Sequence, residues 1–164
     1  MNLKKIITTL SFLLLLSCGY EPMYSKKKIN SGHKFSINTI NFKGDNKVNQ
    51  ILKNKLTKNL NKGKKSTELN LNLDSRVVKT VASKNKKGNP IRFTIKIMTN
   101  LEVFESEILK GKTKFEEEFE YDNKSNKFGL KQYEKNIKDN LISKLSDEII
   151  RYLISLRWYL NHLK

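Results

Sequence analysis

Few side chains in this sequence are of the types that carry out chemistry. Cys18 is the only cysteine, and the two histidines are His33, in a polar basic segment, and His162, near the C-terminus. Neither histidine stands in a metal-ligand pattern or beside a nucleophile. The sequence contains no glycine-rich phosphate loop, nucleophile elbow or Cys/His cluster. It therefore predicts a protein that is not an enzyme and that needs no metal and no cofactor.

The one residue placed for chemistry is Cys18, at the end of an export-type segment. Lys4 and Lys5 precede an apolar run at residues 6–16, which is shorter than the about 20 residues needed to span a bilayer. Leu15, the small Ser17 and the cysteine resemble a bacterial lipobox. The resemblance implies that residues 1–17 are a signal peptide, that the thiol takes a diacylglyceryl group, and that the new amino end is acylated.

Such a lipid anchor has a clear physical basis. Each buried methylene contributes about 0.8 kcal/mol, so one acyl chain binds a membrane reversibly, whereas two or three chains hold it in effect permanently. The alternative is an incidental cysteine near an ordinary cleavage site. The position, spacing and uniqueness of Cys18 favour the anchor. Residues 18–33 are then the lipidated N-terminus and a polar, basic tether.

The chain is strongly basic, and its charge favours partners that are anionic. The net charge of +17 falls to +15 when Lys4 and Lys5 are removed with the signal peptide. A positive balance of this size favours nucleic acid, lipid headgroups or phosphorylated glycolipid. Lys and Asn are frequent along the whole chain, which also suits a genome poor in G and C, so charge alone identifies no ligand.

Alternation and helical spacing divide the rest of the chain into six elements. Leucines at 69, 71 and 73 alternate with polar residues, which predicts a half-buried strand. Apolar residues recur every three or four positions in two other segments, which predicts amphipathic helices. The expected order is a strand at 35–42 with a bulge, a helix that follows turn and N-cap residues at 44–46 and ends near Gly63, strands at 69–82, 91–103 and 109–121, and a long helix at 130–160.

The last two strands are expected to pair across a short reversal at residues 105–107. If odd-numbered residues face the core on both, their outer faces carry opposite charges, worth roughly 0.2–1 kcal/mol per pair. The glutamate run is then sheet surface rather than a catalytic carboxylate pair, and only Glu117, with inward parity, is expected near an edge. The facing sets are Arg92, Thr94 and Lys96 against Glu116, Glu118 and Glu120; the aromatic residues expected in the core are Phe93, Phe115, Phe119 and Tyr121.

The predicted fold class is α+β. An antiparallel four-stranded sheet with one apolar face, covered by two helices, is the economical arrangement for the order β-α-β-β-β-α. This two-layer sandwich forms a single domain over residues 34–164. The last turns of the long helix are apolar on more than one side, which suggests a partner surface or contact with the membrane.

The start of the mature chain carries a family resemblance. Residues 18–24, CGYEPMY, resemble the C-G-[FY]-x-P-[LM]-Y opening of the LptE family of lipopolysaccharide-assembly lipoproteins. The segment INFKGDNKVNQILKNKL is similar to the family's first strand and helix. LNLNL, the basic loop, IRFTIKI, and ILKGKTKFEEEFEYDNKSNKFGLKQYEKN with the long helix that follows match the rest of the family pattern in order.

The resemblance implies a location and a non-catalytic function. Members of the LptE family are anchored to the periplasmic leaflet of the outer membrane, where they plug the lumen of the LptD β-barrel. They help that barrel to assemble and assist lipopolysaccharide delivery to the cell surface. Gly19, directly after the acylated cysteine, is not the aspartate that retains some lipoproteins in the inner membrane. A polar, Asn-rich exterior suits the polar lumen of a barrel.

The family also implies direct lipopolysaccharide binding through basic residues, because phosphates pair well with Lys and Arg. The candidates here are Lys84, Lys86 and Lys87 in the strand-connecting loop, with Arg92 just beyond. They are chosen by charge and loop position. The alternative is a solvated basic loop, and for Arg92 a pair with Glu120 competes directly.

Two other functions compete with the barrel plug. One is a stand-alone, periplasm-facing lipoprotein that binds anionic glycolipid or peptidoglycan without a barrel. The other is an exported nucleic-acid binder. The second is disfavoured because aromatic residues are not interleaved with basic ones on one face, and because a lipid-anchored exported protein seldom meets nucleic acid.

Overall fold

The structure is a computed structural model that describes residues 35–60 and 67–162. The chain divides into two units, Met1–Ser31 and Gly32–Lys164, and every described residue belongs to the second. The expected signal peptide, the lipidation site at Cys18 and the tether lie outside the described residues.

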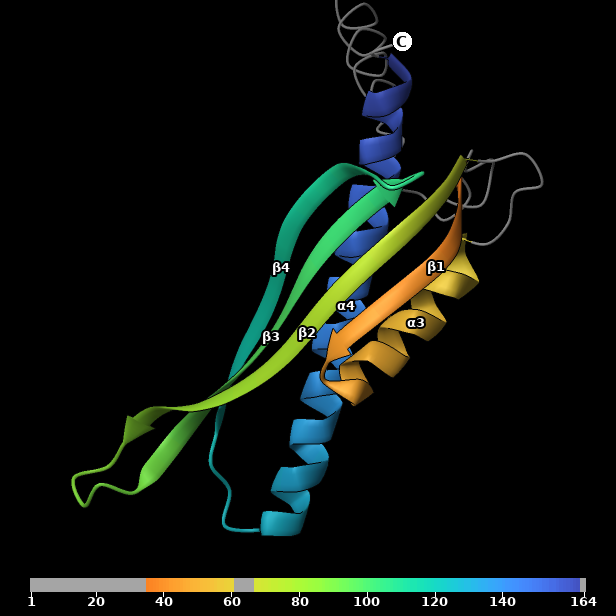
Figure 1. The fold of residues 1–164 in the computed structure, drawn as a ribbon. Helices are drawn as coiled ribbons and strands as arrows, with labels where there is room; N and C mark the ends of the chain where they lie inside the picture. The colour runs from red at the N-terminus through yellow and green to blue at the C-terminus, as the bar shows by residue number, and fades with distance from the viewer. Residues whose placement is uncertain (1–34, 61–66, 163–164) are drawn as a thin grey trace, which may run out of the picture. The chain divides into compact units, whose positions relative to one another are not determined.

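Six elements follow one another in the order β-α-β-β-β-α, which confirms the predicted α+β class (Figure 1). Asp45, within the predicted turn and N-cap stretch 44–46, caps the first helix, because its Oδ1 accepts hydrogen bonds from the backbone N–H groups of Lys47 and Val48, both at 3.0 Å. Asn126 caps the second helix through the N–H of Gly129. The elements are β1 (Phe35–Gly44), α3 (Asn46–Leu60), β2 (Thr67–Lys84), β3 (Pro90–Glu105), β4 (Ile108–Asp122) and α4 (Lys127–His162).

The four strands form one sheet in the order β1-β2-β3-β4, and the prediction of a purely antiparallel sheet is wrong for one pair. β1 runs parallel to β2, whereas β2–β3 and β3–β4 are antiparallel. The reason is that α3 lies between β1 and β2 in sequence. A strand followed by a crossover helix returns to the same end of the sheet, so the next strand runs in the same direction. The bulge expected in β1 lies between Ile37 and Thr39.

Gly44 holds the tight corner between β1 and α3. Its φ of +85° lies in the left-handed region, and a Cβ atom at this position would overlap the carbonyl oxygen of Ser75 on β2. Only glycine satisfies both conditions. The adjacent N–H of Asp45 donates to the same Ser75 oxygen at 2.9 Å, so the corner is tied to the neighbouring strand.

Both helices pack on one face of the sheet, and the core lies between the two layers (Figure 1). Odd-numbered positions of β2 and β3 face the helices, as the alternation predicts. α3 and α4 contribute leucines and isoleucines at helical spacing. The fully buried side chains include Leu52, Leu56, Leu71, Leu73, Ile95, Ile97, Leu101, Leu145 and Ile149.

The prediction for the aromatic residues is right for three and wrong for one. Tyr121 is buried, and Phe93 and Phe115 are partly buried against the core. Phe119 has inward parity but is 45% exposed. It lies on β4, the edge strand, where a side chain has a neighbouring strand on one side only.

Candidate functional surfaces

The hairpin between β2 and β3 carries three of the predicted site residues at its tip. Asn85 shapes this tip: its side-chain oxygen accepts hydrogen bonds from the N–H groups of Lys87 and Asn89, both at 3.0 Å. Gly88, with a φ of +81°, donates its N–H to the Asn85 carbonyl at 2.9 Å. The tip is therefore a defined turn that holds its lysines in place.

The lysines of this turn, Lys84, Lys86 and Lys87, form what we call the cationic tip. All three side chains are exposed. Within the part of the chain that the structure describes, their ammonium groups have no ion-pair or hydrogen-bond partner. Three unpaired positive charges on one short turn attract an anionic group such as a phosphate.

Arg92 differs from these lysines because its charge is already paired. Its Nη1 lies 3.8 Å from Glu120 Oε2, and its Nε donates to Asp122 Oδ1 at 3.2 Å. Both partners come from β4, the strand that pairs with β3 directly beside Arg92. The competing pair with Glu120, weighed from the sequence, is therefore present, and an added ligand would have to compete with two carboxylates.

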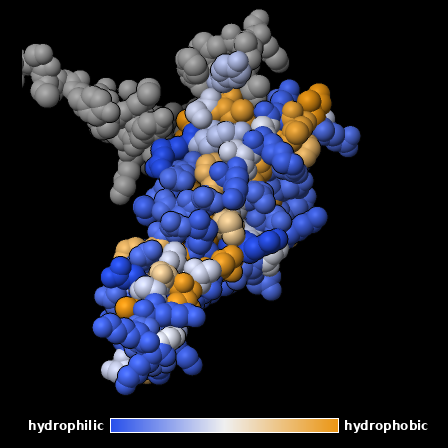
Figure 2. Space-filling view, turned by 90° about the vertical axis from the view of Figure 1, so that its left-hand side faces the viewer, coloured by the Kyte–Doolittle hydropathy of each residue, from blue (hydrophilic) through white to orange (hydrophobic). Residues whose placement is uncertain are grey.

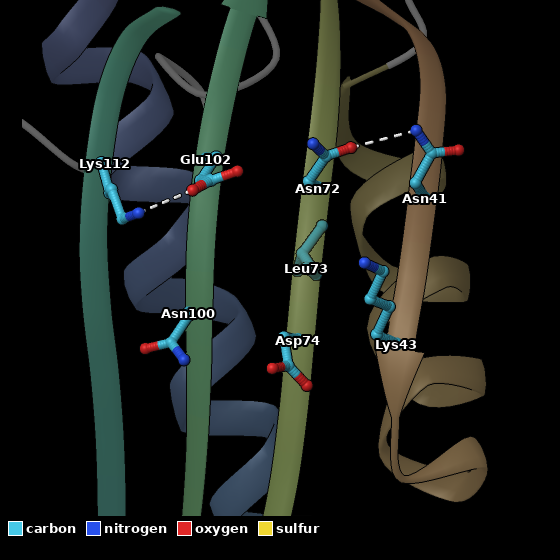
Figure 3. Close-up of a pocket in the computed structure, with 8 residues that line it drawn as sticks. All are labelled: Asn41, Lys43, Asn72, Leu73, Asp74, Asn100, Glu102 and Lys112. Atoms are coloured by element: carbon cyan, nitrogen blue, oxygen red, sulfur yellow. Dashed lines mark hydrogen bonds and ion pairs between the residues drawn. The ribbon is translucent and has the colours of Figure 1, made fainter.

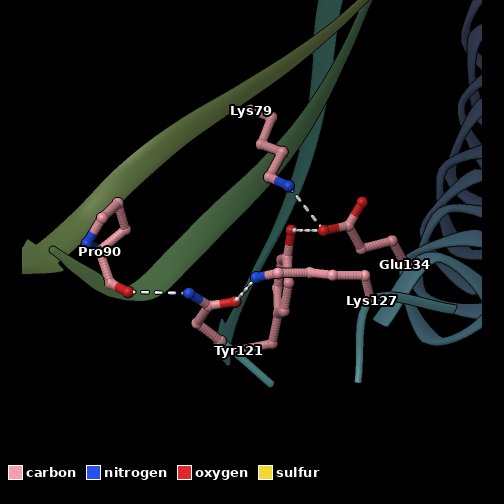
Figure 4. Close-up of polar contacts among 6 residues, drawn as sticks. Lys79, Pro90, Tyr121, Lys127 and Glu134 are labelled. Carbon is pink, nitrogen blue, oxygen red and sulfur yellow. Dashed lines mark hydrogen bonds and ion pairs between the residues drawn. The ribbon is translucent and has the colours of Figure 1, made fainter. Parts of the chain in front are cut away.

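A polar cluster joins the base of the hairpin to α4 (Figure 4). Glu134 Oε1 accepts hydrogen bonds from Lys79 Nζ at 2.6 Å and from the Tyr121 hydroxyl at 2.7 Å. The Lys79 ammonium also lies 4.2 Å from the centre of the Phe93 ring, a cation–π contact. Lys79, Tyr121 and Glu134 thus link β2, β4 and α4 beneath the cationic tip.

Burial and hydrogen bonding shift the pKa values in this cluster. Burial raises the pKa of the Tyr121 phenol, and the hydrogen bond to the Glu134 carboxylate raises it further. Burial also raises the pKa of Glu134, but the hydrogen bonds from Lys79 and Tyr121 outweigh that cost, so its pKa lies below the ordinary value of 4.5. The cluster therefore contains an ionised glutamate and a neutral tyrosine at neutral pH.

A second set of bonds ties the hairpin to the start of α4. Asn123 donates its backbone N–H to the Ile91 carbonyl at 2.8 Å and its side-chain Nδ2 to the Pro90 carbonyl at 2.9 Å. Lys127, the first residue of α4, lies 3.5 Å from the Asn123 side-chain oxygen. The cationic tip is consequently positioned by the body of the domain and not by the hairpin alone.

The face of the sheet opposite the helices is covered by no other described element and is polar. Figure 3 shows the centre of this open face, where Asn41 Nδ2 donates to Asn72 Oδ1 at 3.0 Å and Lys112 Nζ pairs with Glu102 at 2.8 Å. The hydrogen bond from Lys112 holds the pKa of Glu102 below its usual range. These groups line a shallow depression of about 690 Å³; its lining is Asn41, Lys43, Asn72, Leu73, Asp74, Asn100, Glu102 and Lys112.

The glutamate run of β4 is charge-paired surface on the open face, as the sequence predicts. Lys96 lies 2.8 Å from Glu118 and 4.0 Å from Glu116, and Lys114 lies 2.7 Å from Glu116. The Glu118 hydrogen bond and charge raise the pKa of Lys96. The remaining residue, Glu117, points to the helix side of the edge strand, where Lys144 of α4 pairs with it at 2.9 Å.

Sequence reasoning missed two of these features. It did not connect Lys79 or Tyr121 with Glu134, because 55 and 13 residues separate the partners and helix, strand and loop lie between them. The alternation of β2 predicted that Asn70 and Asn72 lie on its solvent-facing side. Their pairing with Thr39 and Asn41 depends on the parallel register of β1, which alternation does not reveal.

The described residues contain neither a metal-binding cluster nor a membrane-spanning helix. Within residues 35–60 and 67–162, no group of three or more His, Cys, Asp or Glu side chains could hold a metal ion. In the same ranges, no helix combines the length and apolar character needed to cross a membrane.

Comparison with known proteins finds similarity at the level of structure. No family model matches the sequence, and no curated protein matches it. The rare lipoprotein B from Shewanella oneidensis superposes with a TM-score of 0.60 at 14% identity, covering 76% of this chain and all of that one. A minor lipoprotein from Acinetobacter baumannii gives 0.58 at 12% identity, with coverage of 77% and 94%.

A third structure agrees with these two. The uncharacterized lipoprotein B from Nitrosomonas europaea gives a TM-score of 0.53 at 12% identity, covering 73% of this chain and 80% of that one. Identities this low carry information about the fold and not about ligands or partners. The chain therefore shares its fold with three bacterial proteins that are named as lipoproteins.

Proposed function

We propose that this protein is an outer-membrane lipoprotein of the LptE type, which plugs and helps to assemble an LptD-type β-barrel and assists lipopolysaccharide delivery to the cell surface. The observation that carries the proposal is the open face of the sheet. It is lined by amides and paired charges, such as Asn41 with Asn72 and Lys112 with Glu102. A barrel lumen is polar, so a surface of this kind is suited to lie against its wall.

The lipid anchor is assigned to Cys18 and rests on the sequence. A diacylglyceryl group on the thiol and an acyl group on the new amino end would hold the protein at the periplasmic leaflet of the outer membrane. Gly19, in place of a retention aspartate, supports that membrane rather than the inner one. The likeness to three structures of named lipoproteins agrees with an anchored protein.

The cationic tip is the proposed contact for lipopolysaccharide phosphates. Its lysines are exposed and unpaired within the described residues, and Asn85 holds the turn that presents them. Arg92 takes second place, because it already donates a hydrogen bond to Asp122 and forms an ion pair with Glu120. The function is binding and assembly without catalysis, and no cofactor is assigned beyond the covalent lipid.

Depletion of the protein tests the proposal directly. If the protein supports the barrel, its loss leaves the barrel misassembled and retains lipopolysaccharide inside the cell envelope. Re-expression of the wild-type chain restores both. Unchanged levels of folded barrel and of surface lipopolysaccharide after depletion would contradict the proposal.

A stand-alone lipoprotein that binds anionic glycolipid or peptidoglycan is the second candidate. The unpaired lysines of the tip favour it, because they can bind a phosphate without help from a barrel. Affinity purification in mild detergent separates the two candidates. A large β-barrel co-purifies if the protein is a plug, and only glycolipid or peptidoglycan fragments co-purify if it acts alone.

A further inference from the structure

Three large hydrophobic side chains are exposed at the end of the sheet that holds the β3–β4 turn. Ile108, Leu109 and Tyr159 are 61, 51 and 58% exposed, and we call them the apolar end. Ile108 and Leu109 begin β4, directly after a two-residue turn in which Ser106 and Glu107 both have positive φ. Both side chains are exposed beside this tight turn, one toward each face of the sheet.

Tyr159 belongs to the same end because α4 packs beside the start of β4. A Cβ atom at Gly111 would lie 3.0 Å from Leu156 Cδ2 and would also meet the Tyr152 hydroxyl. α4 and β4 are therefore in close contact at this level. Leu109 lies two residues from Gly111 toward the turn, and Tyr159 lies about one helical turn beyond Leu156 toward the helix end. Figure 2 shows hydrophobic surface at the upper end of the view, with further hydrophobic patches in its lower half.

The folded domain also starts at this end. Phe35 of β1 pairs with Thr67 at the start of β2, and the first residues of β2 lie opposite the last residues of β3. The start of β1, the β3–β4 turn and the end of α4 consequently share one end of the sheet (Figure 1). The cationic tip lies at the other end, an 18-residue strand away, which corresponds to about 60 Å.

We infer that the apolar end rests on the lipid surface to which the chain is anchored. This rests on the lipid anchor of the proposed function. Cys18 precedes Phe35 by 17 residues, so an acylated cysteine keeps the domain within about 60 Å of the bilayer. Tethering at that distance makes even a weak contact effective, because the second binding step becomes intramolecular.

The chemistry of the apolar end favours lipid over a protein partner. Three side chains are too few for a stable protein interface, which buries roughly 800 Å² on each partner. Tyrosine is enriched where lipid meets water, since its ring is apolar and its hydroxyl is polar. Lys110 is paired with Glu105 at 3.6 Å, so the ammonium group nearest the two aliphatic residues along β4 is already balanced.

Orientation is the functional consequence. With the apolar end on the membrane, the cationic tip is held away from the bilayer, at the distance set by β2 and β3. The lysines then meet an anionic ligand in transit instead of the headgroups of the anchoring leaflet. The membrane contact therefore sets the orientation of the domain before it meets a barrel.

Trp158 provides the measurement, because it is the only tryptophan in the sequence and directly precedes Tyr159. The acylated, full mature protein is reconstituted into phosphatidylethanolamine/phosphatidylglycerol vesicles whose acyl chains carry bromine. We expect its fluorescence to be quenched relative to vesicles without bromine. Replacement I108S/L109S should reduce that quenching at least threefold. The matched control V81S/I91S, which alters two exposed aliphatic residues near the cationic tip, should leave it unchanged.

The outcomes separate this inference from the proposed function. Mass spectrometry that finds Cys18 without lipid overturns the anchor, and the inference with it. An acylated protein whose tryptophan is not quenched in the wild-type chain overturns the inference alone. So does quenching that V81S/I91S abolishes and I108S/L109S does not, since the other end would then face the lipid. Circular dichroism of each variant checks that the fold is retained.

Discussion

Lys84, Lys86 and Lys87 differ from most other charged residues of the sheet in lacking a partner among the described residues. Arg92, Lys96, Lys112 and Lys114 all form ion pairs across or along strands. Paired surface charges contribute little to stability, with a median of about 0–1 kcal/mol. Unpaired charges are free to bind a ligand, so the cationic tip is one part of the sheet's charge that a ligand can use.

Charge reversal at the tip should weaken lipopolysaccharide binding. For K86E/K87E we expect an affinity about tenfold or more below wild type, because each lysine near an anionic surface contributes about 1 kcal/mol. Isothermal titration with purified lipopolysaccharide measures the loss. K53E/K58E, on the exposed side of α3, changes the net charge equally and should bind nearly as wild type. Equal losses in both variants would assign the effect to net charge and not to the tip.

The ionised state of Glu134 gives a pH-dependent prediction. Its pKa is lower in the folded protein than the ordinary 4.5, so its contribution to stability is fully present above about 4.5. That contribution disappears as the pH falls through the lower folded-state pKa. We expect E134Q to lower the free energy of unfolding by about 1–3 kcal/mol at pH 7. The difference from wild type should shrink below pH 4.5 in urea titrations, and a constant difference from pH 7 to pH 3 would contradict the ionised pairing.

At the scale of elements, the corner between β1 and α3 decides the topology. It turns the chain from a strand into a helix while the Asp45 N–H bonds to Ser75 on β2. The crossover through α3 then makes β1 parallel to β2. Leu52 and Leu56 of α3 are fully buried, so the crossover is fixed by packing as well as by the corner.

Two glycines with nearly the same φ offer a matched test of that corner. G44A should destabilise the protein by more than about 3 kcal/mol, because the new methyl group adds a clash with Ser75 to the cost of a left-handed φ. G88A, where no atom lies within 4 Å of the new group, should cost only about 1–2 kcal/mol. Urea unfolding of both variants measures the difference. Similar losses would show that φ alone, and not the approach to Ser75, sets the requirement.

At the scale of the whole molecule, the two faces of the sheet differ in what covers them and in their side chains. One is sealed by α3 and α4 and holds the apolar core. The other is open, and its amides and ion pairs form a continuous polar surface across all four strands. A protein that had only to be soluble could use any polar side chains there. A surface that lies against the inner wall of a barrel needs a particular shape.

A bulky residue on the open face should therefore prevent barrel association without unfolding the protein. Asn100 of β3 lines the depression on that face (Figure 3). We expect N100W to reduce the amount of barrel recovered in mild-detergent purification at least tenfold. N136W, on the exposed side of α4, is the control and should retain recovery. Loss with N136W and retention with N100W would assign the contact to the helical layer instead.

The sequence by itself determined the elements, their order and much of the last hairpin. Alternation and helical spacing are local patterns, so Leu69, Leu71 and Leu73 identify a strand without knowledge of its neighbours. The pairing of β3 with β4 could also be predicted, because a short turn joins two strands whose charges complement each other. The predicted register sets Arg92 opposite Glu120, whereas Arg92 lies opposite Asp122. Lys96 lies opposite Glu118, so the register differs by two residues.

Only the tertiary structure decided which distant residues meet. The parallel direction of β1, the contact of Lys79 with Glu134 and the exposure of Phe119 depend on how layers pack over long sequence separations. The same holds for the gathering of Ile108, Leu109 and Tyr159 at one end and of the unpaired lysines at the other. Local preferences set what each segment can form, whereas burial of the shared core selects how the segments are arranged.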